Sequence, residues 1–405
     1  MEDVISHERK RASAHRMITA ADLAKWPNAT LDGAGLLVDW PVFASPDTRP
    51  LKSSQLVFTH PRLRLPRCEH YALSADGVLL AASFNSTDIL IWRLPDGLLV
   101  QRLLHQGRRE HPSSLSFSPN GRALVSGSEG MTAIIWDVQR GCVLRRLTGH
   151  SSFVDNATYA PDGVHIATSD LNRSVKIWDA LTGACLQSFN LEWHTIRRLT
   201  FSPDSSRLCV QVHNSCVIYD TRFHRRVAVL RHNKANSISC SMSRQGDRVI
   251  TGTYSESCNG VKIWNMVTGH ELLTIDSERK LLPPVAFSPD GAEVLAICGA
   301  DKTALAYDSR TGQLRRTFKP AFISYCVAYS PNGDYVAFGN QQGSLEIYGA
   351  KSGTFIGKAE KPRGTDVGDV GAFKFLPDSR TILLHFLNNS SEPLCLYNIQ
   401  NLVRM

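Results

Sequence analysis

The chain has 405 residues, of which 42% are hydrophobic and 20% are charged, and its formal net charge is +8. No stretch approaches the ~18–20 apolar residues of a membrane-spanning helix, and the charged segment from Met1 to Arg16 lacks the apolar core of a secretory signal. These features argue against a membrane-spanning or secreted protein, so we expect the chain to work in the cytoplasm and/or the nucleus.

Residues 1–51 are interpreted as an N-terminal extension, because they do not share the pattern of the rest of the chain. Their charged head is expected to be partly disordered. Thr19-Ala20-Ala21-Asp22 resembles the start of a short helix that Pro27 would end. The segment from Gly33 to Phe43 is apolar enough to dock on the domain that follows.

From residue 52 onward, one short motif recurs with a period of ~40–45 residues. An apolar residue runs into a turn of the type Ser-Pro-Asp-Gly, in which Pro fixes φ, Asp or Asn bonds its own backbone, and Gly accepts a positive φ. The turns begin at Leu73, Phe117, Tyr159, Phe201, Met242, Phe287, Tyr329 and Phe375. About fifteen residues after each turn an aromatic residue closes a strand: Trp92, Trp136, Trp178, Tyr219, Trp264, Tyr307, Tyr348 and Tyr397.

Residues 52–405 resemble the WD40-repeat family. The third repeat follows the family pattern best, through Gly149-His150, the turn from Tyr159 to Gly163, and Lys176-Ile177-Trp178-Asp179. The resemblance implies an all-β propeller of four-stranded blades. Eight turns favour eight blades, with seven as the alternative. In this family a strand from the N-terminus completes the last blade, and the segment from Ser54 to Thr59 is the natural candidate, since such closure removes exposed sheet edges.

The resemblance also implies a buried hydrogen-bonded set made of a loop His, a Ser or Thr, an Asp and the Trp. In the third repeat we assign His150, Ser169 and Trp178 to this set, with Asn172 in the place of the Asp. An amide offers only neutral hydrogen bonds, worth about 1 kcal/mol each. We therefore predict that the set stabilises weakly and that the blades depend mainly on apolar packing.

Family members commonly bind partners on the face that carries the loops from the outer strand of one blade to the inner strand of the next. Counting ten residues back from the end of each turn gives a candidate ring on that face: Arg67, His111, Phe153, Thr195, Asn236, Leu281, Ile323 and Asp369. Apolar members beside charged ones would form a protein-binding surface with an apolar centre and a polar rim. Ordinary loop packing is the alternative interpretation.

A narrower hypothesis comes from two short segments, Tyr219-Asp220-Thr221-Arg222 and Tyr307-Asp308-Ser309-Arg310. They resemble the aromatic-Asp-x-Arg box by which some WD40 proteins dock, as substrate receptors, on the propeller adaptor of cullin ubiquitin ligases. The box is short, and its Asp and Arg arise readily at this turn.

The positive net charge raises a third hypothesis, a propeller that binds nucleic acid or acidic lipid. The basic pairs Arg145-Arg146, Arg225-Arg226 and Arg315-Arg316 fall in predicted outer strands, where charge protects a sheet edge from pairing. No aromatic residues interleave with these pairs, so solvated edges are favoured over a polyanion site.

Motifs of enzymes, cofactor sites and metal sites are missing from the sequence, including Gly-x-Ser-x-Gly, the Walker loop and HExxH. The ten cysteines contain no CxxC pair, so we expect small buried hydrophobes rather than zinc ligands or disulfides. This interpretation covers Cys185, Cys209, Cys216, Cys240, Cys298, Cys326 and Cys395. The sequence thus predicts a non-catalytic scaffold without cofactor or metal, which binds other proteins as a single propeller within a complex.

Overall fold

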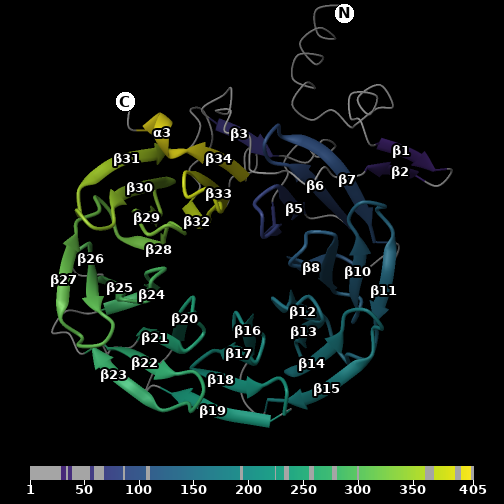
Figure 1. Cartoon of the computed structure of the whole chain (residues 1–405), viewed down its shortest axis with the longest axis horizontal. Coiled ribbons are helices and arrows are strands. Elements are labelled where there is room, and N and C mark those ends of the chain that lie inside the picture. The colour runs from purple at the N-terminus through teal and green to yellow at the C-terminus, as the bar shows by residue number, and fades with distance from the viewer. Residues whose placement is uncertain are drawn as a thin grey trace, which may run out of the picture.

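The computed structural model describes residues 29–32, 35–38, 55–58, 68–84, 87–105, 110–191, 195–223, 225–231, 237–254, 260–275, 281–298, 301–360, 369–387 and 394–402. Eight four-stranded antiparallel sheets stand in a ring around a central axis (Figure 1). The fold is therefore an all-β propeller of eight blades, as predicted, and the seven-bladed alternative is wrong.

The first four blades follow one another along the chain, and each runs from its innermost to its outermost strand. Blade 1 consists of β4 (His70–Leu73), β5 (Leu79–Ser83), β6 (Asp88–Arg93) and β7 (Leu98–Leu104). Blade 2 consists of β8 (Pro112–Phe117), β9 (Ala123–Ser128), β10 (Ala133–Asp137) and β11 (Val143–Leu147). Blade 3 consists of β12 (Val154–Tyr159), β13 (His165–Asp170), β14 (Ser174–Asp179) and β15 (Cys185–Asn190). Blade 4 consists of β16 (Ile196–Phe201), β17 (Arg207–Val212), β18 (Ser215–Asp220) and β19 (Arg225–Arg231).

The next three blades repeat this order. Blade 5 consists of β20 (Ser237–Met242), β21 (Arg248–Tyr254), β22 (Val261–Asn265) and β23 (Glu271–Ile275). Blade 6 consists of β24 (Leu281–Phe287), β25 (Glu293–Cys298), β26 (Thr303–Asp308) and β27 (Leu314–Phe318). Blade 7 consists of β28 (Ser324–Tyr329), β29 (Tyr335–Asn340), β30 (Ser344–Gly349) and β31 (Phe355–Glu360).

Blade 8 is assembled from both ends of the chain. It contains β32 (Asp369–Phe375), β33 (Thr381–Leu387) and β34 (Leu394–Asn398), and its outermost strand is β3 (Gln55–Phe58). β3 pairs antiparallel with β34, with Gln55 opposite Tyr397 and Phe58 opposite Leu394. The predicted closing strand is thus confirmed, and β34 is not left as a free sheet edge.

The recurrent turn has the geometry that its residues predict. In blade 2, Gly121 has a φ of +69° and its N–H bonds the Ser118 carbonyl at 2.9 Å. Asn120 Oδ1 accepts the Arg122 N–H at 3.0 Å, and Ser118 Oγ accepts the Ala123 N–H at 2.9 Å. A local network of this kind forms without help from distant segments, which explains why the sequence reveals each blade.

The apolar core lies between neighbouring blades. β6 and β18 are buried along their whole length. One hydrophobic cluster joins Leu80 of blade 1 to Leu383 of blade 8, and another joins Ile177 of blade 3 to Val210 of blade 4. Each of these blades therefore buries its face against the next one, and ring closure lets the first blade pack on the last.

Two expectations about the cysteines are wrong. Cys185 is exposed on β15 rather than buried. Cys209 and Cys216 form a disulfide between β17 and β18. The sequence does not show this pair, because the two positions become diagonal neighbours only through the register of the two strands, in which Cys209 lies opposite Ile218 and Cys216 opposite Gln211.

Outside the ring, the described part of the extension contains one hairpin, β1 (Ala29–Asp32) and β2 (Gly35–Val38), drawn beside the blades in Figure 1. The helix start predicted at residues 19–22 lies outside the described residues. α3 (Ile399–Leu402) follows β34. Within the described chain, no helix has the length and apolar character needed to cross a membrane.

Candidate functional site

A buried hydrogen-bonded set ties the loop before blade 3 to the strands of that blade. His150 Nδ1 lies 2.9 Å from Asp170 Oδ2, and His150 Nε2 lies 2.6 Å from Thr168 Oγ1. Trp178 Nε1 donates to the same Thr168 oxygen over 2.7 Å. A neutral imidazole with its proton on Nδ1 satisfies all three contacts. Consistent with this, burial lowers the pKa of His150, while the bond to Asp170 opposes that shift.

Two of the residues assigned to this set from the sequence are not part of it. Ser169 is buried on the other face of β13, where it accepts a bond from Asn156 Nδ2 at 3.1 Å. Asn172 is exposed, and its side chain bonds Ser151 Oγ at 3.1 Å. Neighbouring residues of a strand point to opposite faces of the sheet. The assignment of Ser169 was therefore wrong by one position, and the hydroxyl of the set belongs to Thr168. The set contains a carboxylate after all, that of Asp170.

Blade 2 holds a second such set that the sequence did not reveal. His105 Nε2 lies 3.1 Å from Ser126 Oγ, which also accepts a bond from Trp136 Nε1 at 2.9 Å. Leu104 precedes His105 where blade 3 has Gly149, so the Gly-His signal is missing. The presence of Ser126 on the second strand and of Trp136 on the third was the remaining clue.

The predicted partner ring falls at the starts of the innermost strands. His111, Phe153, Thr195 and Ile323 stand directly before β8, β12, β16 and β28, and Asp369 is the first residue of β32. Phe153 and Thr195 are exposed, whereas His111 and Ile323 are half-buried. The side chain of Asp369 and the residues Arg67 and Asn236 lie outside the described part.

Leu281 does not belong on an exposed surface. It is 2% exposed and packs in the hydrophobic cluster that contains Ile263 and Val285. At its register shift, β24 has two extra residues between Leu282 and Val285, whereas β12 has one extra residue between Val154 and Asn156. Counting ten residues back from the turn therefore ends one position inside β24, at Leu281, instead of in the loop before the strand.

A cleft of about 430 Å³ opens on the predicted face, where blades 1, 2, 3 and 8 meet. Phe153 and Leu171 border it and are 41% and 46% exposed. Three carboxylates also line it, those of Glu69, Glu129 and Asp155. Loops contribute Glu69, Glu129, Phe153 and Leu171, which follow or precede strands of blades 1, 2 and 3. The cleft therefore combines exposed apolar area with negative charge.

The His70 imidazole at the edge of the cleft does not offset this negative charge. Burial, with a smaller contribution from His385, lowers the pKa of His70 to about 4. His385 Nε2 lies 3.2 Å from the Cys68 carbonyl oxygen, and its ring packs at 5.3 Å from that of Tyr71. Burial also raises the pKa of Asp155. At neutral pH the cleft thus presents carboxylates without a cationic histidine at His70.

The family assignment agrees with this fold. The family described as IFT122 first beta-propeller matches residues 111–390, which extend from the start of blade 2 to blade 8. The chain belongs to this family of WD40-type propellers. In addition, 68 residues are 46% identical to the Periodic tryptophan protein 2 homolog of Neurospora crassa. That match covers 16% of this chain and 7% of the relative, so the chain spans only a small part of the relative's length. WD40-type propellers typically serve as protein-interaction scaffolds.

In this IFT122-type propeller, the first segment that resembles a ligase-adaptor box spans the end of β18 and the turn to β19. Tyr219 and Asp220 are buried, at 6% and 2% exposure. Asp220 Oδ2 pairs with Arg207 Nη1 at 2.6 Å, while its Oδ1 accepts the N–H groups of Arg222 and Phe223 at 2.9 Å. Within this box, Arg222 is exposed to solvent.

The second box lies at the equivalent turn of blade 6. Asp308 Oδ1 accepts the backbone N–H groups of Arg310 and Thr311 at 2.8 Å, while Tyr307 is buried and Arg310 is exposed. Asp179 makes the same two turn bonds in blade 3, which has no box. The Asp is therefore a turn-forming residue of the propeller, and the exposed Arg is the feature left for a partner.

The basic pairs stand on the outermost strands of the propeller, where we expected them. Arg146 Nη1 bonds Glu110 Oε1 at 2.9 Å, and Arg316 lies 3.2 Å from Glu293. Arg225 stacks over the Phe223 ring at 5.7 Å. Several of these cations already have a partner within the chain, so they favour the solvated-edge interpretation.

Proposed function

We propose that this propeller is a non-catalytic scaffold of the cytoplasm and/or nucleus that binds other proteins, and that its partner docks at the cleft between blades 1, 2, 3 and 8. The observation that carries the proposal is the exposure of Phe153 and Leu171 beside that cleft. Exposed aromatic and aliphatic side chains at the edge of a concave surface are typical anchors of protein interfaces.

The charge of the cleft specifies the kind of segment it would take. Glu69, Glu129 and Asp155 surround the apolar pair. A partner segment with an apolar side chain flanked by Lys or Arg matches this arrangement, because burying like charges would cost several kcal/mol. The cleft volume of about 430 Å³ accommodates one or two large side chains rather than a whole domain.

The proposal is tested by comparative affinity purification from cells. Phe153→Glu places a charge in the apolar centre, and Glu129→Lys reverses a charge at the rim. Leu181→Glu is the matched control, because Leu181 is 79% exposed in the turn between β14 and β15 and does not line the cleft. All three positions are exposed, so the folded state should persist, which a thermal melt verifies.

We expect Phe153→Glu to weaken at least one stoichiometric protein partner by at least ~10-fold, Glu129→Lys to weaken it less, and Leu181→Glu to leave it unchanged. Equal recovery of every partner with all three variants would contradict the docking site.

A cullin adaptor lost on Arg222→Ala or Arg310→Ala would favour the ligase-receptor alternative. Salt-sensitive binding to heparin or acidic vesicles, lost on replacing Arg145, Arg225 and Arg315, would favour the polyanion alternative.

A further inference from the structure

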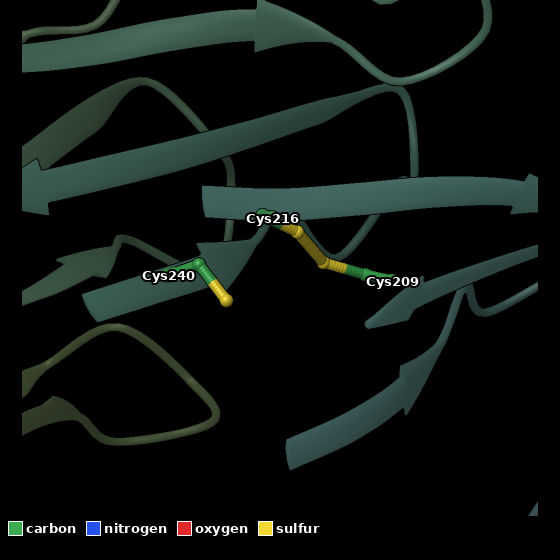
Figure 2. A group of neighbouring side chains, drawn as sticks. All are labelled: Cys209, Cys216 and Cys240. Atoms are coloured by element: carbon green, nitrogen blue, oxygen red, sulfur yellow. A yellow bond between two sulfur atoms is a disulfide. The ribbon is translucent and has the colours of Figure 1, made fainter. Parts of the chain in front are cut away.

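Three cysteines meet at the boundary between blades 4 and 5. Cys209 and Cys216 come from β17 and β18, and Cys240 comes from the innermost strand of blade 5, β20. Figure 2 shows the Cys240 side chain near the disulfide that joins the other two. All three Sγ atoms lie within 4.8 Å of one another. The sequence hides this cluster, because its members come from three strands of two different blades.

The surroundings of the cluster are apolar with one polar side. Cys209 and Cys216 are 2% and 0% exposed and pack with Ile218 and Trp264 in one hydrophobic cluster. Cys240 is only partly buried, so it gives access from solvent. Its thiol bonds Gln211 Oε1 at 3.2 Å, which places a carbonyl oxygen beside the sulfurs.

We propose that the reduced form of this cluster binds one thiophilic d10 metal ion, with Cys209, Cys216 and Cys240 as ligands, and that disulfide formation closes the site. Thiolates prefer soft ions such as Zn²⁺ and Cu(I). A Zn–S bond of about 2.3 Å places two ligand sulfurs about 3.8 Å apart, within the 4.8 Å that encloses the three sulfurs. Gln211 Oε1 or a water completes a tetrahedral set for Zn²⁺, whereas three sulfurs alone suit Cu(I).

The charges of the site fit a metal ion better than three bare thiolates. Zn²⁺ with three thiolates leaves one net negative charge. Arg198, on the innermost strand of blade 4, acts electrostatically on Cys240 and offsets part of that charge.

Opening the site is a two-electron step. A dithiol reductant transfers two electrons and two protons to the Cys209–Cys216 disulfide, which yields two thiols and the oxidised, disulfide form of the reductant. Binding of Zn²⁺ then releases the three thiol protons as three Zn–S bonds form. In the reverse step, a disulfide oxidant accepts two electrons from the Cys209 and Cys216 thiolates and, with two protons from solvent, becomes a dithiol. The two Zn–S bonds break as the Cys209–Cys216 disulfide forms, so the pair that binds the ion in the reduced form excludes it in the oxidised form.

The test uses the full chain, reduced with dithiothreitol and desalted without oxygen. It is exposed to Zn²⁺ alone or to Cu(I) alone, desalted again and analysed for metal per chain by elemental mass spectrometry. Co²⁺ serves as an optical probe, because thiolate ligation produces a charge-transfer absorption band. Cys240→Ser removes one ligand. Cys185→Ser is the matched control, since Cys185 is exposed on β15 and outside the cluster.

We expect about one Zn²⁺ or Cu(I) per reduced chain, and the ion that is retained identifies the preferred metal. Cys240→Ser should weaken binding by at least ~10-fold and remove the cobalt band, Cys185→Ser should match the wild type, and the chain before reduction should retain no ion. If Cys240→Ser melts abnormally, Cys240→Ala and the double variant Cys209→Ser, Cys216→Ser give the same comparison. A reduced wild type without metal, or a Cys240→Ser variant that binds as tightly as wild type, would overturn the proposal.

Discussion

In blades 2 and 3, the preceding loop is connected to the blade by hydrogen bonds among a His, a Ser or Thr, and a Trp. Only blade 3 adds a carboxylate to this set. In both, a His contacts a Ser or Thr hydroxyl that also accepts the Trp indole N–H. In blade 3 the other imidazole nitrogen bonds Asp170 at 2.9 Å. In blade 2, His105 Nδ1 lies 3.9 Å from Glu110, too far for a hydrogen bond.

The comparison shows that apolar packing can tolerate an incomplete polar set. Trp136 and Trp178 are both almost fully buried, at 1% and 2% exposure, and both blades keep the same strand arrangement. The carboxylate mainly changes how the histidine titrates. Burial lowers the pKa of His105 to about 4, while for His150 the Asp170 carboxylate opposes the effect of burial.

The largest effect should follow loss of the indole itself. Trp178→Ala removes a side chain packed against Ile135, Leu147 and Ile166, and we expect it to reduce the free energy of unfolding by about 3–5 kcal/mol through the cavity it leaves. Trp136→Ala should cost a similar amount, although its set lacks the carboxylate. Urea melts check both variants. A much smaller loss for Trp136→Ala would mean that the polar set, rather than packing, determines how much the indole contributes to the free energy of unfolding.

Acidification should affect blade 2 more than blade 3. The folded pKa of His105 is about 4, below the unfolded value of about 6.5, so the unfolded chain takes up the proton first as the pH falls. The contribution of His105 is therefore complete above about pH 6.5 and is lost as the pH falls toward about 4. Between pH 7.5 and 5 this amounts to roughly 2 kcal/mol.

His70, whose pKa is also lowered to about 4, adds a loss in the same direction. The two contributions are separated by urea melts of the wild type and His105→Gln at both pH values. The variant should lose roughly 2 kcal/mol less than the wild type on acidification, and an identical loss in the two proteins would show that His105 does not stay neutral in the fold.

Replacing the Asp170 carboxylate should make the hydrogen-bonded set of blade 3 resemble that of blade 2. Asp170→Asn keeps the size of the side chain but replaces a charged acceptor of the His150 and Ser174 N–H groups, so we expect a loss of about 1–2 kcal/mol at neutral pH. The loss should grow on acidification, because the pKa of His150 falls further without the carboxylate. Thermal melts at two pH values check this, and a loss that shrinks in acid would contradict it.

The smallest effect is expected at Asn172, the position at which the sequence analysis expected the Asp of the family pattern. Because the Asn172 side chain is exposed and donates a hydrogen bond to the nearby Ser151 Oγ at 3.1 Å, Asn172→Asp should change the free energy of unfolding by less than about 0.5 kcal/mol. A stabilisation of 1–2 kcal/mol would restore the original assignment, and a urea melt decides between the two.

The sequence predicted what depends on local chemistry. The turn at Ser118-Pro119-Asn120-Gly121 is held by its own side chains, so its recurrence indicated eight blades. The resemblance to the WD40 family implied a closing strand from the N-terminus, and the alternation from Ser54 to Thr59 indicated which segment forms it. Features that depend on register were not predicted. Asp170 and Thr168 share a face only through the strand alternation of β13, and the two-residue insertion in β24 moved Leu281 into the core. The three-cysteine cluster required the packing of two blades.

The central claim, that Phe153 marks the partner-binding face, is tested most directly by photo-crosslinking in cells. A benzophenone amino acid is incorporated at position 153 and, in a separate protein, at position 181, which is more exposed but lies away from the cleft. We expect a discrete cross-linked protein partner from position 153 that position 181 does not capture. Identical products from both positions, or a partner captured only from position 181, would contradict it.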